Sequence, residues 1–180
     1  MTRTIAALLA SAALGAGMAH ADSHVSAPTP AATAEMRTLD GTIVGTATLT
    51  PGTDGVVVHL SVEGLEPGAK GVHLHAVAEC DPATEFKSAG GHIGDSDSTH
   101  GLLHPEGPHA GDLPNLYVGA DGKGEMQAFT ARVALSETPD GMLDSDGASL
   151  MIHASGDDHF TQPGGTTGAR LACGAFQPTS

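Results

Sequence analysis

The 180-residue chain has no tryptophan, and it contains only one tyrosine and four phenylalanines. Aromatic rings that could stack on nucleic-acid bases are therefore scarce. Basic side chains are also few, because seven Lys and Arg oppose 21 Asp and Glu, which gives a formal charge of −14. A protein this acidic repels nucleic-acid phosphates and anionic membranes, so we expect neither as a partner.

An apolar run long enough to cross a bilayer is also missing. The run Ile5–Leu14 covers about ten residues, whereas a membrane-spanning helix needs about 20. Arg3 precedes this run, and Ala19-His20-Ala21 follows it with the small residues of a signal peptidase site. We therefore expect residues 1–21 to be a cleaved signal peptide of an exported protein, in preference to a buried core helix. No cysteine lies near the cleavage site, so we expect no lipid anchor.

Cysteine is limited to Cys80 and Cys173. In an exported protein, an even and widely spaced pair is typical of a disulfide. The closed loop would hold about 90 residues, for which chain entropy gives roughly 4–5 kcal/mol of stabilisation. Two free buried thiols are the alternative, which an oxidising compartment disfavours.

No segment keeps an apolar stripe of helical period over three turns, and the chain has no internal repeat. Its 25 glycines and 11 prolines instead separate short runs with strand character, at 36–50, 56–62, 71–77, 116–118, 125–133, 149–153 and 170–176. These runs predict an all-β fold, a single antiparallel sandwich or barrel of about eight strands. We expect residues 22–34, rich in Ser, Pro and Ala, to be a flexible arm, and residues 35–180 to form one domain.

One segment does not fit a plain sandwich. From Ala78 to Pro114 about 35 residues run with almost no strand pattern, whereas loops beyond about 12–15 residues are uncommon in compact domains unless they are functional or disordered. Cys80 would tie this loop down, and the loop is rich in histidine. We therefore expect an ordered, functional loop.

Histidines are concentrated around this loop. His73 and His75 lie two apart in a strand run, so both imidazoles point to one face. This pair alone is equally typical of ordinary strand histidines that bind no metal. The loop adds three histidines and one carboxylate, a set typical of structural zinc, and His153 offers a further ligand from another strand. Imidazole clusters of this kind suit copper or zinc. The loop residues are His92, His100, His109 and Asp112.

These stretches together resemble the bacterial copper, zinc superoxide dismutases. The resembling motifs are Gly71-Val72-His73-Leu74-His75, Gly90-Gly91-His92, the segment from His100 through His109-Ala110-Gly111-Asp112-Leu113, Met151-Ile152-His153, and Gly168-Ala169-Arg170-Leu171-Ala172-Cys173-Gly174. The resemblance covers essentially the whole domain. It implies a Greek-key barrel with a long metal-binding loop, a periplasmic location, and one copper and one zinc ion per subunit.

The resemblance also implies a role for each residue of the site. Copper would be held by His73, His75, His92 and His153, and zinc by His92, His100, His109 and Asp112. His92 would bridge the two metals and carry a proton to the reduced substrate. Asp157 would orient one ligand of each metal, and Arg170 would guide the anion beside the copper. Cys80 and Cys173 would form the family disulfide. Whether two chains pair as a homodimer stays open.

The implied activity is dismutation of superoxide to dioxygen and hydrogen peroxide. The alternative is a periplasmic protein on the same fold that stores or delivers copper and zinc without turnover. An adhesive sandwich with incidental histidines is a third reading, which the ligand spacing all but excludes. Arg170 favours the enzyme, because storage needs no anion guide.

Some positions depart from the family pattern. Ile93-Gly94-Asp95 stands where an aromatic, Asn and Pro are usual, and Lys70 stands where many members have a histidine. Lys87 is the only other cation in the metal loop, so we expect it to attract the anion over a distance, although a merely solvated lysine is an equal alternative. Four further histidines match no ligand position, and we expect no metal role for them: His24, His59, His104 and His159.

Overall fold

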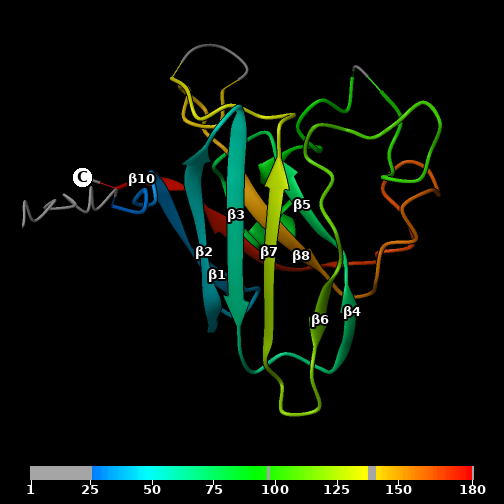
Figure 1. Ribbon diagram of the computed structural model, residues 1–180. Coiled ribbons are helices and arrows are strands. Elements are labelled where there is room, and N and C mark those ends of the chain that lie inside the picture. The colour runs from blue at the N-terminus through cyan, green and yellow to red at the C-terminus, as the bar shows by residue number, and fades with distance from the viewer. Residues whose placement is uncertain (1–25, 97, 138–140, 180) are drawn as a thin grey trace, which may run out of the picture.

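The computed structural model describes residues 26–96, 98–137 and 141–179 (Figure 1). Within these ranges the chain forms ten strands and two short 3₁₀ helices. The strands are β1 (Ala32–Thr38), β2 (Ile43–Gly52), β3 (Gly55–Val62), β4 (Gly68–Lys70), β5 (Val72–His75), β6 (Leu116–Val118), β7 (Gly124–Thr130), β8 (Ser149–His153), β9 (Arg170–Ala175) and β10 (Gln177–Pro178). The helices are η1 (Pro82–Thr84) and η2 (Lys87–Ala89).

All paired strands run antiparallel, in the order β4-β6-β7-β3-β2-β1-β9-β8-β5, and β10 pairs with β1. The sheet therefore begins at β4 and ends at β5, which follow each other in the chain with only Gly71 between them. At this corner the amide of Gly71 donates to the carbonyl of Ser155, and the amide of His153 donates to the carbonyl of Gly71. The two edges are thus joined, and the sheet closes into a barrel. The prediction of an all-β antiparallel fold is confirmed.

The barrel interior is filled by alternate residues of the strands. In β3 the buried side chains are Val56, Val58, Leu60 and Val62, as expected of a strand with one face on the core. In the absence of tryptophan the main core consists mostly of valine, leucine, alanine and methionine, with Phe176 at its edge. Branched and small side chains of this kind pack densely between the strands.

The structure differs from the expected elements at three places. The single run expected at 36–50 is divided between β1 and β2, because the chain turns at residues 39–40. β1 begins at Ala32, inside the segment assigned to the arm, because Ala32 and Ala34 are buried in the core and pair with β2, and Ala32 also pairs with β10. The ten strands exceed the expected eight because the three-residue β4 and the two-residue β10 are strands only through their partners. Residues 1–25, which include the expected signal peptide, lie outside the described residues. No described residue belongs to a helix with the length and hydropathy needed to span a membrane.

Two long connections carry the residues of interest. One joins β5 to β6 through residues 76–115, and the other joins β8 to β9 through residues 154–169. Figure 1 shows both on one side of the barrel. The adjacent strands β5 and β8 are buried along their whole length, so the two loops cover them there. The loop expected at 78–114 is therefore present, and its regular elements are limited to η1 and η2.

Candidate metal centre

Four imidazoles converge where β5 and β8 meet the two loops. One ligand nitrogen of each of His73, His75, His92 and His153 lies within 4.8 Å of those of the other three. His73 and His75 come from β5, where the two-residue period points both into the site. His153 ends the neighbouring strand β8, and His92 reaches the site because it forms a β-bridge with His75.

Three of these histidines each have one buried nitrogen without a hydrogen-bond partner, namely His73 Nδ1, His75 Nε2 and His153 Nε2. The opposite nitrogen of each ring is engaged. His73 Nε2 lies 2.8 Å from Asp157 Oδ2, His75 Nδ1 donates to the Gly90 carbonyl at 3.0 Å, and His153 Nδ1 donates to the Gly168 carbonyl at 3.4 Å. Buried polar atoms are rarely left unpaired. Three such nitrogens, on residues whose ligand atoms lie within 4.8 Å of one another, fit a bound metal cation.

Burial also keeps these rings uncharged. It lowers the pKa of His73 to about 4 and that of His153 to about 3, and it holds the pKa of His75 well below its usual value. Imidazole must be neutral to ligate a metal, so these residues are ready to bind at neutral pH without losing a proton.

A second group of donors surrounds the carboxylate of Asp112. Its Oδ1 lies 2.9 Å from His92 Nδ1, 3.0 Å from His100 Nδ1 and 3.7 Å from His109 Nδ1. The four residues with mutual ligand distances within 4.8 Å are His73, His92, His100 and Asp112. His109 is not among these four, although its Nδ1 is 3.2 Å from His92 Nδ1. His73 lies close to this group as well, since its ring centroid is 4.0 Å from that of His92.

His92 belongs to both groups. Its Nδ1 faces Asp112 and His109, so Nε2 is the nitrogen left for the first group. A single imidazole with one nitrogen in each group is the geometry of a bridging ligand. The arrangement can therefore hold two cations side by side.

Asp157 also joins the two groups. Its carboxylate contacts His73 Nε2 at 2.8 Å and His100 Nε2 at 3.0–3.1 Å, so it fixes one ring of each group. Burial alone would raise the pKa of Asp157, but the hydrogen bonds with His100 and His73 hold it well below its usual range. Burial likewise opposes a charge on His100, but its hydrogen bonds with Asp112 and Asp157 raise the pKa of His100 to about 9.

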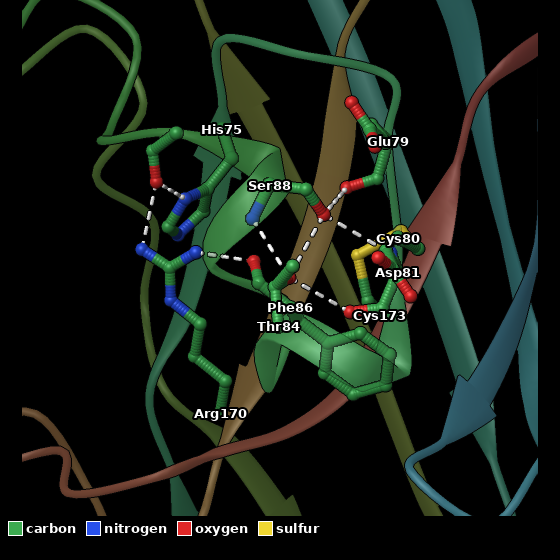
Figure 2. Close-up of a disulfide and its surroundings, with 10 residues drawn as sticks. His75, Glu79, Cys80, Asp81, Thr84, Phe86, Ser88, Arg170 and Cys173 are labelled. Carbon is green, nitrogen blue, oxygen red and sulfur yellow. Dashed lines mark hydrogen bonds between the residues drawn. A yellow bond between two sulfur atoms is a disulfide. The ribbon is translucent and has the colours of Figure 1, made fainter.

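A pocket of about 450 Å³ opens onto the first group. His75, His92, His153 and Arg170 line it, so the one guanidinium in its wall faces the imidazoles. The Arg170 side chain is held by two backbone carbonyls: Nη1 donates to Phe86 at 2.5 Å and Nη2 to Gly90 at 2.7 Å (Figure 2). The Gly90 carbonyl also accepts the bond from His75, so one peptide group orients both residues.

The Phe86 and Gly90 carbonyls that hold Arg170 follow Cys80 in a segment of the β5–β6 connection, which the disulfide attaches to β9. Cys80 is bonded to Cys173 on β9, as predicted, three residues after Arg170. Ser88 ties the segment together, since its hydroxyl donates to the Glu79 carbonyl and accepts from the Asp81 amide, both at 3.0 Å (Figure 2). A fixed cation beside a buried imidazole cluster is suited to draw a small anion onto a metal.

Comparison with known proteins agrees with this geometry. The family model described as copper/zinc superoxide dismutase (SODC) matches residues 43–176. The chain belongs to this family. The superoxide dismutase [Cu-Zn] of Caulobacter vibrioides is 41% identical over 149 residues, which cover 81% of this chain and 85% of that protein. Superoxide dismutase [Cu-Zn] 2 of Aquifex aeolicus is 39% identical, over 80% of this chain and 85% of that one.

Solved structures of the family share the fold. The Cu/Zn superoxide dismutase from Brucella abortus matches with a TM-score of 0.62 and 29% identity, over 79% of this chain and 97% of that one. A SOD-like protein from Bacillus subtilis matches with a TM-score of 0.73 and 38% identity, over 79% of this chain and 96% of that one.

The positions that depart from the family pattern have local explanations. Ile93 packs against the core and its amide donates to the Leu74 carbonyl at 3.0 Å, so an aliphatic side chain fills this place. Gly94 has a φ of +77°, which glycine adopts without strain. Lys70 is buried, and its ammonium donates to the Ala154 carbonyl at 2.9 Å beside His153.

Lys87 is exposed and is not among the residues that line the pocket. Its ammonium lies 2.8 Å from Glu85 Oε2, so a neighbouring carboxylate offsets its charge. The expected role in attracting the anion stays a prediction.

The remaining histidines lie apart from the ligand groups. His59 pairs with Glu125 on the outer surface, and the ring of His104 packs on Phe160. His159 lies beside Asp157: its backbone amide donates to Asp157 Oδ1 at 2.7 Å, its Nδ1 lies 3.5 Å from Asp157 Oδ2, and its Nε2 lies 3.3 Å from Asn115 Nδ2. His24 lies outside the described residues.

Three polar residues that contact the site were not predicted. Arg132 donates to the backbone carbonyl of Asp112 at 3.1 Å, while Asn115 and Gln162 bond to the backbones of Asp157 and His100. Bonds from a side chain to a distant backbone follow no sequence period, so no motif marks these residues.

Proposed function

We propose that this protein dismutates superoxide to dioxygen and hydrogen peroxide, with one copper and one zinc ion bound per subunit. The observation that carries this proposal is the set of three unpartnered buried imidazole nitrogens, because two of them belong to His75 and His153, which line a pocket together with Arg170. Relatives that cover most of the chain bear the name superoxide dismutase [Cu-Zn].

We assign copper to the first group and zinc to the second. Copper would be held by His73, His75, His92 and His153, whose donors are all nitrogens. Zinc would be held by His92, His100, His109 and Asp112, a closed set of the type that structural zinc prefers. His109 enters this set because its Nδ1 faces the same carboxylate oxygen as the other two rings.

When bound, copper would supply a one-electron redox couple for the oxidation of one superoxide to dioxygen and the reduction of a second, with two protons, to hydrogen peroxide. The residues of the chain do the rest. Arg170 holds the anion by charge and by planar donors. His92 would hold a proton at Nε2 only when that nitrogen is free of copper, and could then deliver it to the reduced substrate. Asp157 fixes the rings of His73 and His100, as carboxylates beside metal ligands commonly do.

A protein that stores or delivers the two metals is the second candidate. The same ligands would serve it, but it would have no use for a guanidinium fixed by two carbonyls in the pocket wall. The placement of Arg170 therefore favours turnover.

Metal analysis and superoxide consumption on the mature protein test this proposal. We expect about one copper and one zinc per chain and rapid loss of superoxide, and His109→Ala is expected to lower zinc content first because His109 contacts only the second group. Two bound metals without superoxide consumption would favour storage. Loss of copper alone in His109→Ala would show that the two sites are assigned wrongly.

Zinc binding is expected to release a proton from His100. The folded-state pKa of about 9 lies above the ordinary value of 6.5, so His100 is protonated in the metal-free protein near pH 8 and must become neutral to ligate. Calorimetric titration with zinc in buffers of different ionisation enthalpy should show about one proton released from this residue near pH 8 and almost none near pH 10.5. A proton count that stays constant over this range would contradict the assignment.

Charge reversal at Lys87 tests whether it attracts the substrate. Lys87→Glu is expected to lower kcat/KM several-fold at low salt, with an effect that shrinks once the Debye length falls to about 10 Å near 0.1 M salt. Lys123→Glu, in the distant β6–β7 turn, is the matched control, because Lys123 also lies near a carboxylate, that of Glu63. Equal and small effects at both positions would show that Lys87 has no such role.

We place the protein in the periplasm. The N-terminal pattern of residues 1–21 is that of a cleaved signal peptide, and an oxidising compartment favours the disulfide. Mass spectrometry of the protein purified from its host should find a mature chain that begins at Asp22.

A further inference from the structure

Two side-chain amides hold the backbone of the metal loops in a reciprocal arrangement. Gln162 comes from the β8–β9 connection and bonds to His100 in the β5–β6 connection. Asn115 comes from the end of the β5–β6 connection and bonds to Asp157 in the β8–β9 connection. Each loop thus supplies an amide that grips a residue of the other.

Both amides contact the N–H and the C=O of a single residue. Gln162 Oε1 accepts from the His100 amide at 2.9 Å, and Gln162 Nε2 donates to the His100 carbonyl at 2.8 Å. Asn115 Oδ1 accepts from the Asp157 amide at 2.8 Å, and Asn115 Nδ2 donates to the Asp157 carbonyl at 2.8 Å. An amide that pairs with both backbone groups mimics a neighbouring strand, so it fixes the position and the orientation of the residue it holds.

The two gripped residues are bonded to each other across the loops. The His100 ring is fully buried, with Nδ1 at 3.0 Å from Asp112 and Nε2 at 3.0–3.1 Å from Asp157. The direction of this ring therefore depends on where the His100 and Asp157 backbones lie. No strand or helix of the described chain contains either residue. Side-chain hydrogen bonds therefore hold these two backbones in place of the backbone hydrogen bonds of a sheet.

We propose that Gln162 and Asn115 are positioning residues that set the donors of the second metal group in place before the metal binds. The proposal rests on the function proposed above, in which His100 ligates zinc and Asp157 orients it. Gln162 Nε2 also donates to the Phe160 carbonyl at 2.9 Å, which stabilises the turn that presents the amide. A ligand set held in this way pays less ordering entropy on binding than a loose one.

Zinc affinity of the mature protein tests the proposal. Gln162→Glu and Asn115→Asp keep the side-chain size and the accepting oxygen but remove the donor, so each loses its bond to the gripped carbonyl. We expect each to weaken zinc binding roughly tenfold or more, in the range seen when partners of metal ligands are changed. Gln127→Glu is the matched control, because Gln127 is exposed on β7, where it pairs with His59 of β3 and with neither loop. Competition with a chromophoric chelator gives the dissociation constants.

Cobalt(II) in place of zinc gives a second readout, because its visible spectrum reports the geometry of the ligands. The spectrum should change in Gln162→Glu and Asn115→Asp but not in Gln127→Glu. Zinc affinities within twofold of the parent in both variants would overturn the proposal, and a loss confined to one variant would overturn the reciprocal arrangement. A parent protein that binds no zinc would instead contradict the proposed function.

Amide hydrogen exchange on the metal-free parent does not depend on whether the variants fold. If the bonds from Gln162 to His100 and from Asn115 to Asp157 exist before the metal binds, the amide protons of His100 and Asp157 are protected from exchange relative to exposed amides of the same loops. Exchange of both at the rate of exposed loop amides would overturn the proposal, even if zinc binding by the parent is tight.

Discussion

Replacement of both Cys80 and Cys173 by serine is expected to lower the unfolding midpoint of the metal-loaded protein by roughly 10–20 °C. The disulfide joins residues 93 apart in the sequence, and closing a loop of this size contributes roughly 4–5 kcal/mol through the entropy of the unfolded chain. One kcal/mol corresponds to roughly 2–4 °C in a domain of this length. Thermal unfolding of variant and parent, both loaded with copper and zinc, measures the shift.

The same substitution should also lower activity, because the disulfide holds the segment that positions Arg170. Phe86 and Ala89 pack with Met151 and Cys173 in a small buried cluster of their own, outside the main core. Without the covalent bond this cluster is the main anchor for the Phe86 and Gly90 carbonyls. Reduction of the parent protein with a thiol is the control, since it breaks the same bond without a substitution. An unchanged midpoint in the variant would contradict the prediction.

The hairpin of β2 and β3 shows what could be predicted about the fold. Residues 56–62 alternate in burial, and the Gly- and Pro-containing segment 51–55 contains the two-residue turn Thr53-Asp54 that joins β2 to β3. Asp54 has a φ of +59°, a conformation that aspartate tolerates better than most residues. Local chemistry therefore determines this hairpin.

The short strands could not be predicted in the same way. β4 contains Gly68 and follows a proline, and it is extended only because it pairs with Tyr117 and its neighbours on β6. Ala32 and Ala34 have little intrinsic preference for strands, and they join β1 through pairing with β2 and β10. Such pairings depend on residues far away in the sequence, which no local pattern reveals.

Some residues of the candidate site could also be predicted, and some contacts near it could not. His73 and His75 could be identified from strand period and side-chain chemistry, and the structure brings them together with His92 and His153. The pairing of Lys87 with Glu85 could not, because it depends on the left-handed backbone at Glu85, where φ is +55°. Spacing in a strand is set by geometry, whereas contacts within an irregular loop depend on its individual turns.

Replacement of Arg170 by alanine is expected to lower kcat/KM for superoxide by about 10–100-fold while both metals stay bound. Arg170 contacts no residue of the second group and contributes no ligand atom to the first, so metal content should not change. A hydrogen bond to a charged group contributes roughly 1.5–3 kcal/mol, which corresponds to rate factors of this size if the bond forms in the transition state.

Two further variants separate the charge of Arg170 from its placement. Arg170→Lys keeps the charge but cannot reach both the Phe86 and Gly90 carbonyls with a planar fork, so we expect it to recover only part of the lost rate, chiefly at low salt. Arg37→Ala removes an exposed arginine from β1 that bonds to Glu35 and Gly41, and it controls for the loss of one positive charge. Pulse radiolysis at several ionic strengths measures all three variants on protein of known metal content. If Arg170→Ala and Arg37→Ala consume superoxide at the same rate as the parent, Arg170 does not bind the anion, and its two carbonyl bonds serve only to brace the loop.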